Sequence, residues 1–158
     1  MKNFTIILKR YRILFLGLVL LFTSSFSISE DSKSYIHKVL NSCYDIKAEQ
    51  EGLRSFELKI TNKGFCRYRK VFLNGKEEFF AFNLSRFKKM SYYGTTEQGE
   101  LCLHTQNDDV IVQTRRDRKG DIDSMATALY IPLKNVEVEQ LNELARCFNE
   151  LAEKPKTN

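Results

Sequence analysis

Four basic residues lie close together in the second half of the chain: Arg115, Arg116, Arg118 and Lys119. Guanidinium and ammonium groups bind phosphates and lipid head groups, so this cluster is a candidate site for an anionic lipid or another polyanion. Arg115 and Arg116 are adjacent, and adjacent residues of a strand face opposite sides of the sheet. The two side chains can therefore bind the same ligand only if a β-bulge turns them to the same side. The alternative is a solvated strand edge, whose charges prevent pairing with another sheet edge.

A thiol and an imidazole lie two residues apart, at Cys102 and His104. On a strand they share one face, and a histidine beside a cysteine can act as the base that activates the thiol for nucleophilic catalysis. Their Cβ atoms are expected about 6.5–7 Å apart, which does not ensure a hydrogen bond. The sequence contains no G-x-S-x-G turn and no glycine-rich phosphate loop. We therefore assign no catalytic residue and expect a non-enzymatic domain, with a thiol-dependent enzyme as the alternative.

Three carboxylates, Asp117, Asp121 and Asp123, follow or interrupt the basic cluster. Carboxylate oxygens suit Ca²⁺, but the spacing departs from the calcium-binding loop, which also needs a bidentate acid at its end. Short acidic side chains in such loops commonly make turn hydrogen bonds instead. No two cysteines have the spacing of a zinc finger. We expect neither a metal nor a cofactor.

Aromatic residues are concentrated in the middle of the chain, which contains no Trp: Tyr68, Phe72, Phe79, Phe80, Phe82, Tyr92 and Tyr93. They could line a groove for a ligand or a peptide, or they could fill the core of a β-domain. Phe79 and Phe80 are adjacent, so on a regular strand they face opposite sides of the sheet. One of these two rings is therefore expected outside the main core, against a helix, a partner or a ligand.

The first 27 residues have the three parts of a secretory signal peptide. Four basic residues without an acid precede the apolar segment at residues 13–22, and small residues at 23–27 follow it. A membrane-spanning helix needs about 20 apolar residues, more than this segment has. We expect a cleaved signal and a periplasmic or secreted protein. The alternative is a protein anchored to the membrane by an uncleaved N-terminal helix.

Four cysteines lie after this segment: Cys43, Cys66, Cys102 and Cys147. An even number in an oxidising compartment favours two disulfides, and three pairings are open. The alternative is four buried free thiols, because Cys is among the most buried residue types.

The positive charge of the chain is largely in the signal segment. The full chain has 25 Lys and Arg against 20 Asp and Glu. Removing residues 1–27 removes four basic residues and leaves a net charge near +1. A nucleic-acid-binding domain usually carries a strong positive charge, so we expect no nucleic-acid partner. The expected partner is a protein, a peptide or an envelope component, and membrane contact is expected only through the signal segment.

The spacing of apolar residues predicts the elements that position these side chains. Helical spacing predicts a helix over residues 32–48 and a second one over residues 137–154, which Pro155 stops. Alternation predicts seven strands, over residues 56–61, 65–73, 77–84, 87–93, 100–105, 110–114 and 125–133. Asn74-Gly75 predicts a hairpin, because both residues tolerate positive φ. Pro132 suits a strand end or a sheet edge.

These elements divide the chain into four parts. They are a signal peptide (1–27), an N-terminal helix with its connection (28–55), a β-domain with a C-terminal helix (56–154) and a polar tail (155–158). The predicted fold class is mainly β, of the α+β type, because helices flank the strands. About seven antiparallel strands form a sandwich or a partly open barrel, capped by the C-terminal amphipathic helix.

Three passages carry a resemblance to a known fold: FNLSRFKKMSYYG, GELCLHTQNDDVIVQT and ALYIPLKNVEVEQLNELARCFNEL. In order and length of elements, residues 56–153 resemble small bacterial members of the pleckstrin-homology-like superfold. The resemblance implies a binding or scaffolding module and transfers no functional residue, because a shared fold does not specify function.

Overall fold

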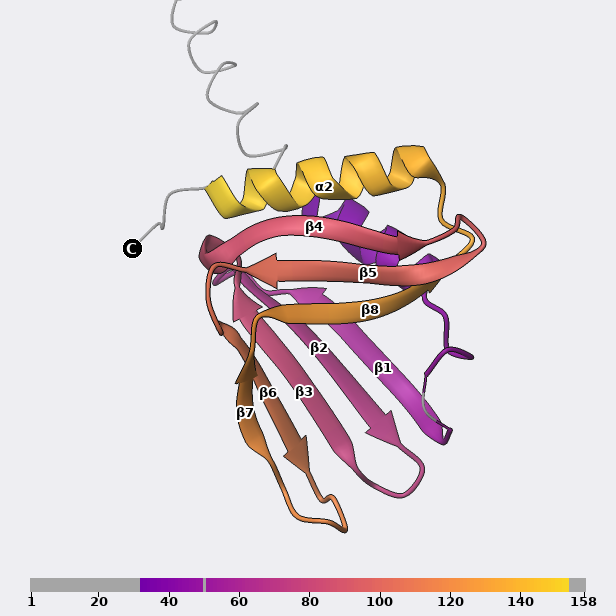
Figure 1. Cartoon of the computed structure of the whole chain (residues 1–158), viewed down its shortest axis with the longest axis vertical. Coiled ribbons are helices and arrows are strands. Elements are labelled where there is room, and N and C mark those ends of the chain that lie inside the picture. The colour runs from indigo at the N-terminus through magenta and orange to yellow at the C-terminus, as the bar shows by residue number, and fades with distance from the viewer. Residues whose placement is uncertain (1–31, 50, 154–158) are drawn as a thin grey trace, which may run out of the picture.

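The computed structural model describes residues 32–49 and 51–153 (Figure 1). The predicted signal peptide (1–27) and polar tail (155–158) lie outside the described residues. Within those two described ranges, no helix is long and apolar enough to cross a lipid bilayer.

The described chain contains eight strands in two antiparallel sheets. The larger sheet has the order β1-β2-β3-β6-β7, with β1 (Leu53–Ile60), β2 (Phe65–Phe72), β3 (Glu77–Asn83), β6 (Val110–Arg115) and β7 (Asp123–Ala126). The smaller sheet has the order β4-β5-β8, with β4 (Phe87–Gly94), β5 (Gln98–Thr105) and β8 (Ala128–Lys134). The sheets face each other without closing into a barrel. The predicted mainly β fold is therefore confirmed, with its open, sandwich-like form.

The predicted hairpin at Asn74-Gly75 joins β2 to β3. Gly75 has a φ of 85°, a conformation that residues with a Cβ rarely adopt. The Asn74 side chain accepts a hydrogen bond from the Lys76 backbone N–H at 2.9 Å. Local turn chemistry thus sets the register of β2 against β3.

The predicted seventh strand is divided in two, which accounts for the eighth strand. Its first part, β7, pairs with β6 in the larger sheet, and its second part, β8, pairs with β5 in the smaller one. The chain changes sheets at Thr127, whose carbonyl accepts the backbone N–H of Thr105 at 2.9 Å. Alternation continues across this point, so the sequence pattern does not reveal the change of sheet.

The N-terminal helix covers residues 32–42 of the described chain and ends earlier than the predicted 48. After it, the chain pairs with the edge of β8: Lys134 N–H donates to the Cys43 carbonyl at 2.7 Å. The apolar spacing at residues 43 and 44 therefore reflects burial against β8 rather than another helical turn.

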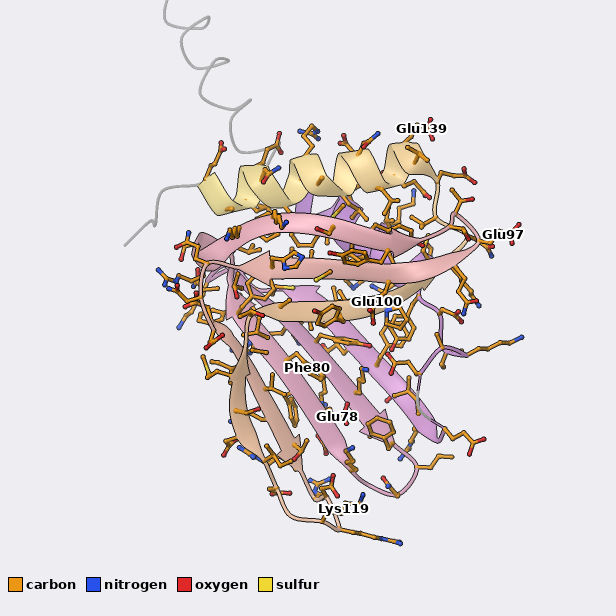
Figure 2. All side chains as sticks on the ribbon, in the orientation of Figure 1. Glu78, Phe80, Glu97, Glu100, Lys119 and Glu139 are labelled. Carbon is orange, nitrogen blue, oxygen red and sulfur yellow. The ribbon has the colours of Figure 1, made fainter. Side chains whose placement is uncertain are left out.

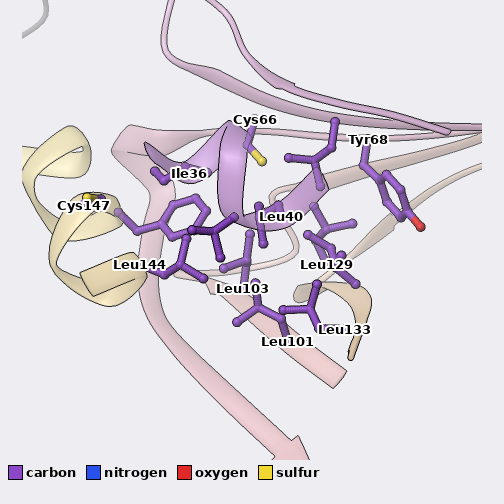
Figure 3. Close-up of a cluster of buried hydrophobic side chains, with 14 of the residues drawn as sticks. Ile36, Leu40, Cys66, Tyr68, Leu101, Leu103, Leu129, Leu133, Leu144 and Cys147 are labelled. Carbon is purple, nitrogen blue, oxygen red and sulfur yellow. The ribbon is translucent and has the colours of Figure 1, made fainter. Parts of the chain in front are cut away.

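The C-terminal helix α2 (Val138–Glu153) agrees with the prediction and lies across β4 and the short 3₁₀ helix η1 (Leu84–Arg86) (Figure 1). The core lies where the helices meet the two sheets. Ile36 and Leu40 of the N-terminal helix point into the same buried cluster as Leu103 and Leu144 (Figure 3). Two rings complete this end of the core, because Phe148 of α2 stacks on Phe87 of β4 with 5.6 Å between centroids.

The four cysteines are buried free thiols, where two disulfides were predicted. They lie on four different elements: Cys43 follows the N-terminal helix, Cys66 is on β2, Cys102 on β5 and Cys147 on α2. Each is accommodated separately; the Cys43 thiol, for example, donates to the Asn135 carbonyl at 3.7 Å. Burial as small apolar side chains accounts for their positions without pairing.

Candidate binding face

The predicted basic cluster is divided by ion pairs. Arg115 ends β6 and contacts Asp123 at 2.9 Å. Arg116 has a φ of 58° and contacts Glu77 at 2.8 Å. The left-handed conformation of Arg116 supplies the break in strand geometry that Arg115 and Arg116 need in order to hold one ligand together. The guanidinium groups of both residues, however, already have carboxylate partners.

The other two members of the cluster lie in the exposed loop between β6 and β7. Figure 2 shows Lys119 at the end of this loop, directed away from the sheets. Within the described ranges, neither Arg118 nor Lys119 has a carboxylate at ion-pair distance. The structure thus does not bring the four basic residues together in one site.

The acidic residues of this loop serve as local acceptors. Asp121 accepts the Asp117 backbone N–H at 3.2 Å, and Asp117 accepts the Lys119 backbone N–H at 2.9 Å. This second bond, with the nearby Lys76 ammonium, lowers the pKa of Asp117. No group of three ligating side chains suited to a metal occurs in the described part of the chain.

Cys102 and His104 approach closely, with 3.2 Å between Sγ and Nε2. Burial raises the pKa of the Cys102 thiol. Burial, together with Lys89 and Lys88, lowers the pKa of His104. Both shifts favour a neutral thiol beside a neutral imidazole, whereas a nucleophile requires the thiolate. The pair exists, but its electrostatics do not activate the sulfur.

A different face of the molecule has the features of a binding site. We call the face of the larger sheet turned toward β4, β5 and β8 its inner face, and the opposite one its outer face. The adjacent rings separate as expected: Phe80 packs against the core on the inner face, whereas Phe79 lies on the outer face. In Figure 1 both helices lie on the side of the smaller sheet, so neither covers the outer face.

The outer face carries a groove of about 350 Å³, which we call the outer groove. Its side chains come from four neighbouring strands and are Glu57, Lys59, Phe65, Arg67, Arg69, Phe79, Ala81, Ile111 and Gln113. The register brings them together in two rows across the sheet, because Lys59 pairs with Arg67, and Glu57 with Arg69. Clefts of this size, apolar with a few polar groups, are typical of ligand sites.

Two arginines of the outer groove lie over aromatic rings. The Arg67 guanidinium is 5.9 Å from the centroid of Phe65, and that of Arg69 is 5.4 Å from Phe79. Cation–π contacts of this kind hold the planar group while leaving its edge available for hydrogen bonds. Arg69 also contacts Glu77 at 2.7 Å, whereas Arg67 is exposed and has no carboxylate at ion-pair distance among the described residues.

The outer groove also contains apolar side chains on β3 and β6. Ile111 is 40% exposed, and its cross-strand neighbour Met125 is 54% exposed. Ile111 adjoins Ala81 through the pairing of β3 with β6, and Met125 lies beyond Ile111 on β7. An anionic partner with apolar side chains therefore matches this face in charge and in polarity.

Sequence reasoning did not find the outer groove, although its parts were visible. Phe65, Arg67 and Arg69 alternate on one face of β2, as Phe79 and Ala81 do on β3. The strand order makes the β2 residues neighbours of the β3 residues, and the position of the helices decides which face of the sheet is the outer one. No family model, curated protein or solved structure matches this chain.

Proposed function

We propose that this chain is an exported, non-enzymatic interaction domain whose outer groove binds an anionic, partly apolar segment of a partner protein. The observation that carries the proposal is the position of Arg67 over Phe65, exposed and without a carboxylate partner in the described residues, within an apolar groove that no described element covers. The predicted signal peptide supports export, with an uncleaved anchor as the alternative.

Recognition would combine two kinds of contact. A carboxylate of the partner accepts hydrogen bonds from Arg67, and charge-assisted bonds of this geometry are about twice as strong as neutral ones. Apolar side chains of the partner cover Phe79 and Ile111 and remove their exposed surface from water. Lys59 is less important, because it already contacts Glu57 at 2.6 Å.

The test uses short capped peptides that carry Glu and Tyr, and the same peptides with Gln in place of Glu. We expect the Glu peptides to bind the described domain, with the dissociation constant raised about tenfold by the change to Gln and by Arg67→Ala. The control is Lys88→Ala with Lys89→Ala, since these exposed lysines lie on β4, away from the outer groove. Equal binding of Glu and Gln peptides, or no binding of either, would overturn the proposal.

A second candidate function is recognition of an anionic lipid or polyanion through the β6–β7 loop. The exposure of Arg118 and Lys119 favours it, whereas the ion pairs of Arg115 and Arg116 weaken it. Vesicles with and without phosphatidylserine test it: salt-sensitive binding that Arg118→Glu with Lys119→Glu abolishes would support it. Absence of binding to both vesicles by the unmodified protein would exclude it.

The pleckstrin-homology-like relationship is also a proposal, supported by the order of strands followed by one C-terminal helix. A thiol-dependent enzyme remains the weakest alternative, because the pKa shifts of Cys102 and His104 favour neutral groups. Disulfide formation after export is a separate proposal, which the intact mass of the exported protein tests.

A further inference from the structure

The edge of β8 is only partly paired. In the smaller sheet β8 pairs with β5 on one side, and on the other side it meets a short segment of its own chain at Tyr44, opposite Leu133. Lys134 N–H donates to the Cys43 carbonyl at 2.7 Å, and Asp45 N–H donates to the Pro132 carbonyl at 3.0 Å. This self-pairing demonstrates that the edge of β8 accepts a strand.

The self-pairing ends for a chemical reason. In an antiparallel ladder, Asp45 and Pro132 would exchange two backbone hydrogen bonds. Proline has no N–H, so only one of the two can form. The chain then leaves the edge: the Lys47 N–H donates to the Asp45 side chain at 3.0 Å instead of pairing with the next residue of β8.

The part of the edge beyond Pro132 has no partner in the described chain. The backbone groups of Pro132 and Lys134 point to this edge, and alternation directs those of Tyr130 and Ala128 to the same side. Thr127 is an odd-numbered residue, and its carbonyl points to β5, as the alternation of backbone groups along a strand requires. Tyr130 is also 50% exposed. An N–H and a carbonyl at Tyr130 are therefore available for a strand from outside.

A notch of about 300 Å³ lies beneath this open part of the edge. Its floor is the inner face of the larger sheet, and its lining includes Phe80, Val112, Ala126, Lys70, Glu49 and Pro132. Figure 2 shows Phe80 below β8, in the opening between β8 and the larger sheet, and Glu100 above it on the smaller sheet. Lys70 is neutralised by Glu49 at 2.6 Å, so the floor favours an apolar side chain over a charged one.

We propose that the open edge of β8 binds an extended peptide segment of a partner protein by strand addition. The peptide residue opposite Tyr130 exchanges two backbone hydrogen bonds with it, which gives affinity without regard to side chains. The next peptide residue points inward, and its apolar side chain enters the notch over Phe80 and Val112. On the outward side, the exposed Glu100 carboxylate favours a basic peptide residue. This site is distinct from the outer groove, which lies on the opposite face of the larger sheet.

Proline at position 130 tests the backbone contact directly. The Tyr130 N–H points away from β5, so Tyr130→Pro removes the donor at the free edge and leaves the ladder with β5 intact, as Pro132 does naturally. Tyr130→Ala is the matched control, since it removes the same side chain but keeps the N–H. The probe is a library of short randomised peptides with both ends blocked, selected on the unmodified protein.

We expect Tyr130→Pro to raise the dissociation constants of selected peptides at least about tenfold, and Tyr130→Ala to change them much less. Ala126→Phe, which fills the notch, should also weaken binding and replaces the proline variant if that one does not fold. Selection of no binder, or equal binding to Tyr130→Pro, overturns the proposal.

Two further outcomes separate this site from other interpretations. Peptides lost with Arg67→Ala but not with Tyr130→Pro bind the outer groove, which supports the proposed function and contradicts strand addition at β8. If the unmodified protein dimerises in sedimentation velocity and Tyr130→Pro is monomeric, the edge pairs with a second copy of this chain, and the partner-peptide proposal is wrong.

Discussion

The hydroxyl oxygens of Tyr44 and Tyr68 lie 2.5 Å apart, and both contact Oε1 of Glu49 at 2.7 Å. Lys70 Nζ contacts the second oxygen, Oε2, at 2.6 Å. We call these four residues the Glu49 cluster. Burial raises the pKa of both phenols, so both hydroxyls keep their protons at neutral pH and donate. The cluster therefore ties the irregular segment after the N-terminal helix to β2.

Replacing the centre of the Glu49 cluster should destabilise the protein markedly. The Glu49 side chain is 5% exposed, so Glu49→Gln leaves the partly buried Lys70 without a counter-charge. We expect the free energy of unfolding to fall by about 2–4 kcal/mol, measured by urea denaturation. The control Glu57→Gln removes a half-exposed partner of Lys59 and should change stability by less than about 0.5 kcal/mol. Equal effects of the two changes would contradict a structural role for the cluster.

The contribution of Glu49 should depend on pH. Burial acts to raise its pKa, but hydrogen bonds from Lys70, Tyr44 and Tyr68 outweigh burial, and the pKa is lowered from 4.5. A carboxyl whose pKa is lower in the folded state stabilises above its unfolded pKa, and this contribution is lost as the pH falls through the folded value. The stability difference between unmodified protein and Glu49→Gln should therefore be constant near neutral pH and shrink below about pH 4.5. Urea titrations at several pH values measure it, and a difference that grows on acidification would show that the sign is wrong.

The cysteines should resist alkylation until the protein unfolds. Burial raises the pKa of Cys66 to about 12, so almost no thiolate is present at neutral pH. We expect iodoacetamide to add to none of the four cysteines in the native protein and to all four in denaturant, measured by intact mass. An exported sample whose mass lacks four hydrogens would contain two disulfides. Rapid native labelling of Cys102 would instead revive the thiol-enzyme alternative.

The interior between the sheets should tolerate truncation poorly. Leu103 is fully buried in the cluster that joins both helices to the smaller sheet. Leu103→Ala should lower the free energy of unfolding by about 2–5 kcal/mol, through lost burial and the remaining cavity. Leu73 makes the matched control because it is 74% exposed, and Leu73→Ala should have almost no effect. Comparable losses for both would contradict the observed core.

Local patterns determined most of the elements. Period-two alternation predicted the strands, because side chains on a strand alternate between a buried and a solvated face whichever strand is its neighbour. The same rule separated Phe79 from Phe80, and the φ preference of Gly75 placed the β2–β3 hairpin. These features depend on neighbouring residues only, so a single sequence is sufficient to read them.

The candidate site was less predictable. The sequence indicated Arg115 and Arg116 as a candidate site because several basic residues are clustered there. In the structure, Arg115 forms an ion pair with Asp123, and Arg116 forms one with Glu77. The outer groove depends on Arg67 and Phe79 being on neighbouring strands, with neither helix of the described chain above them. Strand order and helix placement arise from long-range packing, which alternation does not encode.

By itself, the sequence determined a mainly β domain with two amphipathic helices. The export signal is a prediction from the same sequence. Only the tertiary structure decided that the chain changes sheets at Thr127, that the first helix gives way to pairing with β8, and that four cysteines stay apart. The physical reason is the same in each case. A backbone hydrogen bond or a buried contact between distant residues selects among local conformations that the sequence pattern leaves nearly equal in free energy.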